Sequence, residues 1–141
     1  MDSLGKVFDI FIMAVVFFIF PVLWVMDRTE QTGMYALGRI ASDFLYVSEK
    51  EACIDAGNLN GLDNMLENLY GDYSASIIVK RRIWDSEMGY GTVDYESIIP
   101  YGTILDEIGE EGRFMLNKND TLIVEISDAK SLLIRKARTV T

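Results

Sequence analysis

The chain has 141 residues, with 22 acidic and 13 basic side chains and a net charge of −9, so it lacks the basic excess that binding to nucleic acid or to an anionic membrane surface requires. It contains no histidine and one cysteine, Cys53, which excludes an internal disulfide, most zinc sites and every catalytic pair built on histidine. We therefore expect a protein that is not an enzyme and that needs no cofactor or metal.

Residues 7–26 form the most apolar stretch of the chain, with Asp9 as the one charged side chain. The uncharged part, residues 10–26, would span about 25 Å as a helix, the short end of a bilayer crossing. A cleaved signal peptide is the alternative, but its apolar core is usually shorter, and no small-x-small cleavage site follows residue 26. We predict a retained membrane anchor, with the acidic remainder outside the cytoplasm.

Two residues of this stretch are not needed by a plain anchor. Asp9 places an ionisable group at the edge of an apolar helix, where it is either paired with another group or held at the headgroup level. Pro21 removes a backbone hydrogen bond and kinks or loosens a membrane helix, either for a function or as a tolerated irregularity.

Residues 27–56 continue the helix with an amphipathic pattern. Apolar residues recur at Met34, Leu37, Ala41 and Phe44, a spacing of three and four that defines one helix face. The simplest arrangement is one helix of about 50 residues, roughly 75 Å long, that ends before Gly57; a break within residues 27–33 is the alternative. The predicted domains are residues 1–56, the helix, and residues 57–141, a small head.

The head begins with a short helix and a strand. Asn58 and Asn60 offer capping side chains for the helix. Its apolar positions are Leu62, Met65, Leu66 and Leu69. Residues 74–84 are rich in β-branched side chains, and apolar residues alternate with basic ones, which predicts a strand. Within it lies the basic run Lys80-Arg81-Arg82, which either meets an acidic patch on another copy or is a solvated strand end.

The irregular pattern of residues 85–101 predicts a loop of about sixteen residues. A strand near residues 93–98 is the alternative for part of it. Three tyrosines, Tyr90, Tyr95 and Tyr101, make this loop a candidate partner-binding element.

The sequence of the rest of the head predicts a helix, a hairpin and a last strand. Thr103 can cap a helix that ends at Gly112, and residues 113–116 and 121–127 flank a polar turn. Residues 132–140 suit a final strand with basic side chains towards solvent. The predicted fold class is α+β, with an antiparallel sheet. An acidic cluster on the short helix fits a solvated face better than a calcium site, because its spacing does not match a calcium-binding loop; its members are Asp106, Glu107, Glu110 and Glu111.

The order of these parts resembles the type IV pilin superfamily, and more closely the tight-adherence (TadE/TadF-like) pseudopilins of Gram-positive bacteria. The resemblance rests on Phe17-Phe18-Ile19-Phe20-Pro21-Val22, on Ala56-Gly57-Asn58-Leu59 with the segment 65–73, and on Leu116-Asn117-Lys118-Asn119-Asp120 before a strand.

The resemblance implies a pilus subunit at the cell surface, which sits in the cytoplasmic membrane until a type IV pilus-like assembly machinery packs it against identical copies. Asp9 would then pair with Lys6 or the amino terminus of a neighbour, and Ile40 and Val47 would meet other subunits. The expected subunit-packing residues are Phe8, Asp9, Phe11, Ile12, Val15, Phe18, Ile19, Pro21 and Val22. A membrane-anchored minor pseudopilin, an assembly factor and a small ligand-sensing ectodomain remain alternatives.

Overall fold

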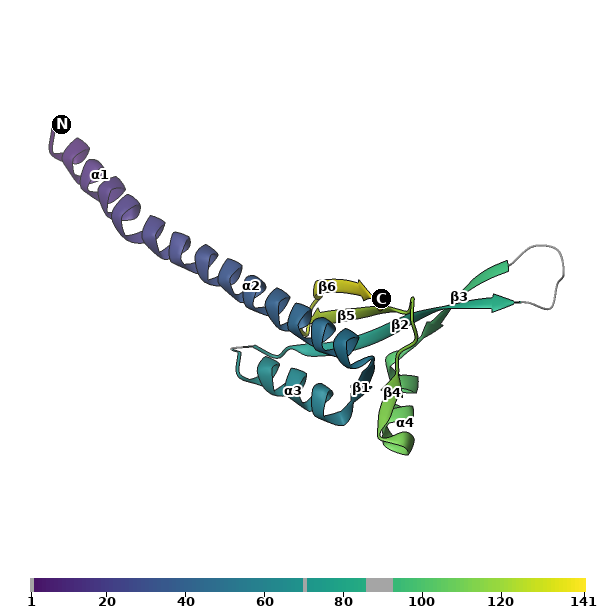
Figure 1. Cartoon of the computed structure of the whole chain (residues 1–141). Coiled ribbons are helices and arrows are strands. Elements are labelled where there is room, and N and C mark those ends of the chain that lie inside the picture. Colours follow the sequence, from purple (N-terminus) through teal and green to yellow (C-terminus); the bar gives the residue numbers. More distant parts are fainter. Residues whose placement is uncertain (1, 70, 86–92) are drawn as a thin grey trace. The chain divides into compact units, whose positions relative to one another are not determined.

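The computed structural model describes residues 2–69, 71–85 and 93–141, and the chain divides into two compact units, Met1–Tyr35 and Ala36–Thr141. Figure 1 shows the order of the elements along the chain. A long N-terminal helix is followed by a small head of antiparallel sheets and short helices, so the predicted α+β class is confirmed.

The N-terminal helix consists of α1 (Asp2–Ala14), a π-helical turn η1 (Val15–Ile19) and α2 (Phe20–Glu51). The break considered within residues 27–33 is absent, since α2 runs through them. The second half of α2 belongs to the head, where one face is buried. Leu37, Ala41, Phe44 and Leu45 are each at most 7% exposed and form part of the core, whereas Met34, on the predicted apolar face, is 37% exposed.

The end of α2 differs from the prediction. The helix stops at Glu51 because Ala52 adopts a left-handed backbone conformation, with φ of 54°, and the expected stop at Gly57 is wrong. Gly57 instead lies in the first turn of α3 (Ala56–Glu67). The Asp55 carboxylate caps α3 by accepting the backbone N–H of Asn58 at 2.7 Å, so the caps expected from Asn58 and Asn60 are also wrong.

Between α2 and α3 lies β1 (Cys53–Asp55), which pairs antiparallel with β4 (Arg113–Met115). The hairpin predicted from residues 113–127 is therefore wrong, since β4 and β5 (Thr121–Ser127) belong to different sheets. Asn119, with φ of 70°, turns the chain from one sheet to the other.

The larger sheet has four antiparallel strands in the order β3-β2-β5-β6. Its strands are β2 (Ser74–Asp85), β3 (Val93–Ile99), β5 and β6 (Leu132–Thr139). The strands expected at residues 74–84 and 132–140 are confirmed, and so is the optional strand near residues 93–98. The loop predicted for residues 85–101 is correspondingly shorter, and its centre, residues 86–92, lies outside the described residues.

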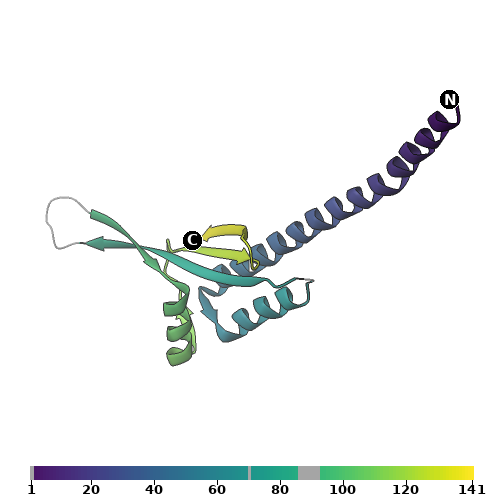
Figure 2. The ribbon, with the colours of Figure 1, turned by 180° about the vertical axis from the view of Figure 1, so that it is seen from behind.

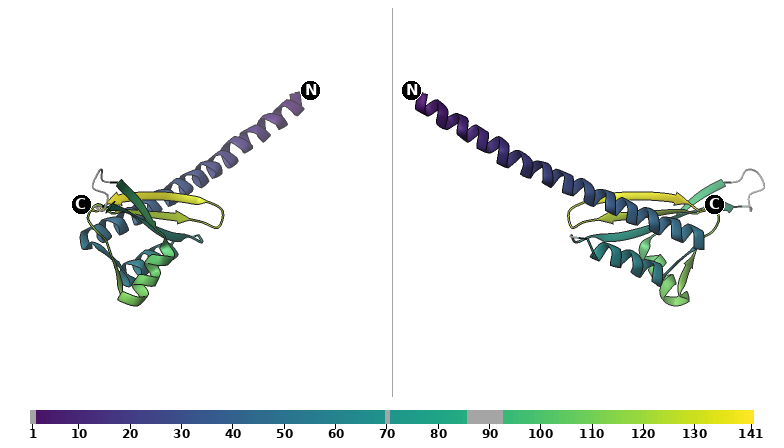
Figure 3. Two further views of the ribbon diagram at one scale, coloured as in Figure 1. Left: turned by 90° about the vertical axis from the view of Figure 1, so that its right-hand side faces the viewer. Right: turned by 60° about the vertical axis from the view of Figure 1, so that its left-hand side comes forward.

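One face of this sheet carries the core. Ile77 and Val79 of β2 and Val124 and Ile126 of β5 are fully buried, and α3 and α4 (Tyr101–Glu111) lie on the same side of the sheet in both views of Figure 3 and, from behind, in Figure 2. Gly112, with φ of 81°, ends α4 as predicted. Thr103 does not cap it, because α4 begins two residues earlier, directly after Pro100.

The edge strand β6 is fastened to α2 by polar contacts. Lys136 donates to the Ser42 hydroxyl at 3.0 Å, and Arg138 pairs with Glu49 while its guanidinium lies 5.4 Å from the ring of Tyr46. The hydrogen bond from Arg138 lowers the pKa of the Glu49 carboxyl. The basic side chains of β6 are exposed, as expected, but two of them also hold the helix.

Candidate functional site: the exposed apolar helix

One helix of the described chain, from Ser3 to Glu51, is long and apolar enough to cross a membrane, with a mean hydropathy of 2.5 in its most apolar window. None of that window is buried. Large side chains such as Phe11, Phe18 and Trp24 are 66%, 74% and 63% exposed. A helix that is apolar on all sides is stable only inside a membrane or against other protein surfaces, so this segment needs a cover that the described residues do not supply.

The predicted subunit-packing residues all lie on this helix. Phe8, Phe11, Phe18 and Val22 are more than half exposed, and Ile12 and Ile19 are each 49% exposed. Val15 is half-buried. Each is therefore available to a partner, although every other side of the segment is available as well.

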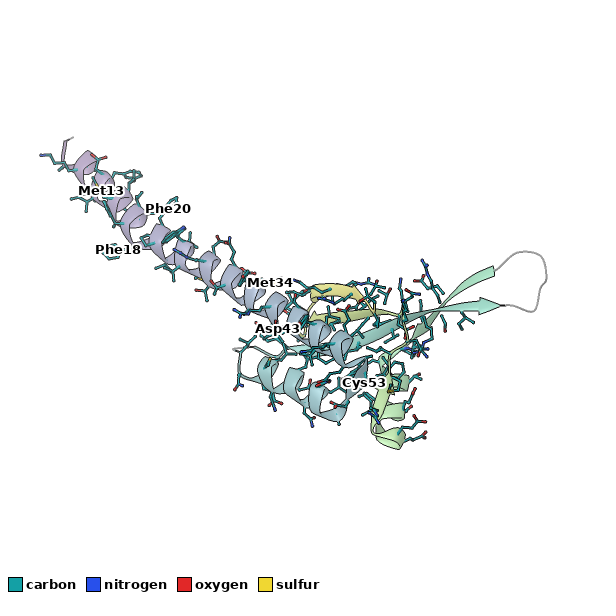
Figure 4. The ribbon with its side chains drawn as sticks, in the orientation of Figure 1. Met13, Phe18, Phe20, Met34, Asp43 and Cys53 are labelled. Carbon is teal, nitrogen blue, oxygen red and sulfur yellow. The ribbon has the colours of Figure 1, made fainter. Side chains whose placement is uncertain are left out.

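The π-helical turn at Val15–Ile19 changes how these residues line up. A π turn holds about one residue more than an α turn, so the residues after it are rotated by roughly 100° relative to those before it. Phe18 and Val22 consequently do not continue the face of Phe8 and Ile12. Figure 4 shows Phe18 and Phe20 pointing to opposite sides of the helix. The packing residues thus form two short faces.

Pro21 accounts for this turn. An α-helix would direct its ring against the carbonyl of Phe17, four residues earlier, and Pro21 has no N–H to offer that carbonyl. Widening the preceding turn relieves the clash, and the turn that precedes Pro21 is the π-helical one, Val15–Ile19. The sequence predicts a disturbance at Pro21, but not its form.

Asp9 is exposed, and no described residue forms an ion pair with it. A carboxylate on an apolar helix is costly in a membrane or a packed interface unless a cation comes close. Solvent, a headgroup or another molecule can supply the partner that the described residues do not.

The far end of the apolar segment carries a contact that the sequence prediction missed. The guanidinium of Arg28 lies 5.3 Å from the centroid of the Trp24 ring, and Asp27 accepts a hydrogen bond from Gln31 at 3.1 Å. Tryptophan beside a cation is typical of the membrane–water boundary. The spacing of four residues at the end of an apolar run was the signal that could have revealed it.

A shallow apolar groove of about 170 Å³ lies in the head between α2 and α3. Its lining includes Ile40 and Val47, the two α2 residues expected to meet other subunits, together with Gly61 and Met65. Met65 is 50% exposed. Val47 is 39% exposed, whereas Ile40 is half-buried and packs against the core.

Of the three tyrosines in the predicted loop, Tyr95 and Tyr101 are described, and they lie in different elements. Tyr90 lies outside the described residues, and Tyr95 is placed in β3, in register with Ile83. Tyr101 begins α4 and packs against the core, where burial, and secondarily the charge of Asp63, raises its pKa. Tyr95 and Tyr101 thus belong to regular elements, and a partner-binding loop that includes Tyr90 stays a prediction.

The basic run of β2 is divided between the two faces of the sheet. Arg81 turns inward to the buried carboxylate of Asp120, at 2.8 Å, whereas Lys80 and Arg82 alternate to the other side of β2. The four carboxylates of α4 lie on its accessible surface. Among the described residues, no group of three or more carboxylate, cysteine or histidine side chains could hold a metal ion.

Comparison with known protein families, with curated proteins and with solved structures finds no match for this chain, so the case for its function comes from its own residues.

Proposed function

We propose that this protein is a structural subunit of an extracellular pilus-like filament, held first in the cytoplasmic membrane and then in the filament core by residues 7–26. One observation carries the proposal. The helix is apolar and exposed on all sides in its first part, and it continues without a break into α2, whose last turns build the core of the head.

This continuity matters because it joins the head to the apolar segment by a regular helix instead of a flexible linker. An anchor that only tethers a domain does not require this. In a filament, by contrast, a shared helix would carry each packed segment directly into its head. Direct fusion of the two parts therefore supports a packing role over simple anchoring.

Association of the helices would come from close contact and polar pairing, because apolar surface gains little when it leaves lipid for another apolar surface. The aromatic residues Phe8, Phe11 and Phe18 supply contact area. Asp9 supplies the polar group, and we propose Lys6 or the amino terminus of a neighbouring copy as its partner. Extraction from the bilayer would need an assembly machinery, with the acidic head outside the cytoplasm.

The test separates packing from anchoring. In one variant, residues 10–26 are all replaced by leucine, which keeps the length and the apolar character of the anchor but removes its shape. We expect this variant to stay in the membrane fraction as the parent does, while filaments sheared from producing cells are lost. An Asp9→Asn variant should also lower the filament yield, and Asp27→Asn, outside the apolar segment, should not.

Equal filament yield from the parent and the all-leucine variant would contradict packing by specific side chains. If both chains stay in the membrane and neither yields filaments, the protein is an anchored accessory subunit instead.

A further inference from the structure

The face of the four-stranded sheet opposite the core carries a polar pocket. Ile77 and Val79 of β2 point into the core, so Lys80 and Arg82, which alternate with Val79 along the strand, lie on the other face. The pocket has a volume of about 250 Å³. Its lining residues are Lys80, Arg82, Glu96, Asn119, Thr121 and Thr139.

The charged side chains that line the pocket are Lys80, Arg82 and Glu96, and the ion pair between Lys80 and Glu96 is weak. Lys80 lies 3.8 Å from Glu96, with 31% and 58% of the two side chains exposed. Exposed pairs of this kind contribute between zero and about 1 kcal/mol, so Lys80 can exchange Glu96 for another carboxylate. The hydroxyls of Thr121 and Thr139, 3.3 Å apart, offer hydrogen-bond donors beside it.

A matching anionic surface lies on the other side of the same sheet. Ile104 and Ile108 bury one face of α4 in the core that also contains Ile77 and Val79. Figure 3 shows α4 on the same side of the sheet as α3. The accessible part of α4 carries Asp106, Glu107, Glu110 and Glu111, and none of these four forms an ion pair with a described residue.

We infer that the polar pocket on the outer sheet face binds the acidic surface of α4 from a second copy of this chain. Lys80 in the pocket and the carboxylates of α4 are complementary in charge, and they lie on opposite faces of the sheet, so α4 of a head cannot reach the pocket of the same head. A contact between unlike surfaces on opposite sides is heterologous and adds further copies in one direction. This inference rests on the proposed filament and names the contact between its heads.

Two engineered cysteines test the contact without removing any charge. In a Cys53→Ser background, Thr139→Cys places a thiol at the pocket. Gly109→Cys places one on the exposed side of α4, where an added Cβ meets nothing within 4 Å. The two full-length chains are co-expressed with distinguishable tags and oxidised in membranes. Gly61→Cys on α3, where an added Cβ also meets nothing within 4 Å, is the matched control.

We expect a disulfide between the Thr139→Cys and Gly109→Cys chains. Neither Thr139→Cys with itself nor Thr139→Cys with Gly61→Cys should give one at comparable yield. Salt at 1 M, where the screening length is about 3 Å, should reduce the yield. A like-with-like product as strong as the mixed product, an equal product with the α3 control, or no mixed product would overturn the inference.

Charge reversal supplies a second measurement. Lys80→Glu with Arg82→Glu, or Asp106→Lys with Glu110→Lys, should each lower the mixed yield at least about tenfold, because like charges facing each other cost more than the ~1.4 kcal/mol that a factor of ten represents. Combining both reversals in every chain should restore the yield, and failure to restore it would contradict the contact. Filaments without the mixed disulfide would refute this contact alone, and the disulfide without filaments would refute only the proposed filament.

Discussion

Asp120 is the residue on which the turn between the two sheets depends. Its side chain is 2% exposed, and its carboxylate accepts hydrogen bonds from Nε and Nη2 of Arg81 and from the backbone N–H of Asn117. The Arg81 guanidinium also donates to the Met115 carbonyl at 3.1 Å and lies 5.7 Å from the Phe114 ring. One ion pair therefore ties β2 to the strand β4 and to the turn that follows it.

Replacing Asp120 by alanine should destabilise the head by about 3 kcal/mol. This is the low end for a buried pair that loses one partner, because 27% of the Arg81 side chain is still exposed. The measurement is urea unfolding of the full-length protein in detergent, in which the labelling of Cys53 reports the unfolded fraction. Asp106→Ala, an exposed carboxylate, should change the free energy of unfolding by less than about 0.5 kcal/mol; equal losses in both variants would refute the role of Asp120.

Cys53 should respond to pH as a buried thiol. Burial raises its pKa, and the carboxylates of Glu51 and Asp55 add to the shift. The folded state thus keeps its proton at a pH where the unfolded thiol, with a pKa near 8.5, loses it. Folding stability should therefore fall as the pH rises above about 8.5. At pH 8, labelling of Cys53 should be at least about tenfold slower in buffer than in urea, and equal rates would contradict its burial.

For single residues, local spacing predicted which face of a strand a side chain occupies, but it did not predict burial that depends on distant contacts. Strand alternation correctly predicted that Lys80 and Arg82 share a face, because a period of two is local to the strand. The burial of Asp120 could not be predicted in this way. It depends on Arg81, which lies 39 positions earlier in the chain, and an aspartate in a polar turn usually faces solvent.

At the scale of elements, the periodicity of apolar residues predicted whether a segment is a helix or a strand, but it did not predict the residues at which the segment ends. The helical stripe of α2 and the β-branched run of β2 follow from local spacing. The stop of α2 at Ala52 does not, because nothing in an alanine favours a left-handed conformation. Contacts elsewhere hold it, including the hydrogen bond from the Leu116 N–H to the Ala52 carbonyl at 2.9 Å. The pairing of β1 with β4 is likewise a tertiary contact.

Pro21→Ala tests the cause of the π-helical turn. Alanine restores the N–H that can donate to the Phe17 carbonyl, so an α-helical register should replace the turn. A proline inside a helix costs about 3 kcal/mol, and amide hydrogen exchange within residues 15–20 should therefore slow by at least about tenfold in detergent. Leu23→Ala, a neighbouring change that leaves the backbone donors intact, is the control. Unchanged exchange in Pro21→Ala would assign the turn to another cause.

At the scale of the whole molecule, the apolar segment was predictable because length and composition alone define a membrane-crossing helix. The division of the head into two sheets was not predictable, because it is set by pairings between distant segments. The register change at η1 was also missed, since it is a property of the backbone ahead of a proline. The expected packing residues lie before, within and after this turn, so they form two faces instead of one.

The central claim is that residues 7–26 pack against the same segment of other copies. Electron cryo-microscopy of material sheared from producing cells tests it most directly. The account predicts helical filaments with an axial repeat, in which these segments contact one another in the core and the heads lie outside. Single particles without an axial repeat, or filaments in which residues 7–26 do not contact one another, would contradict it.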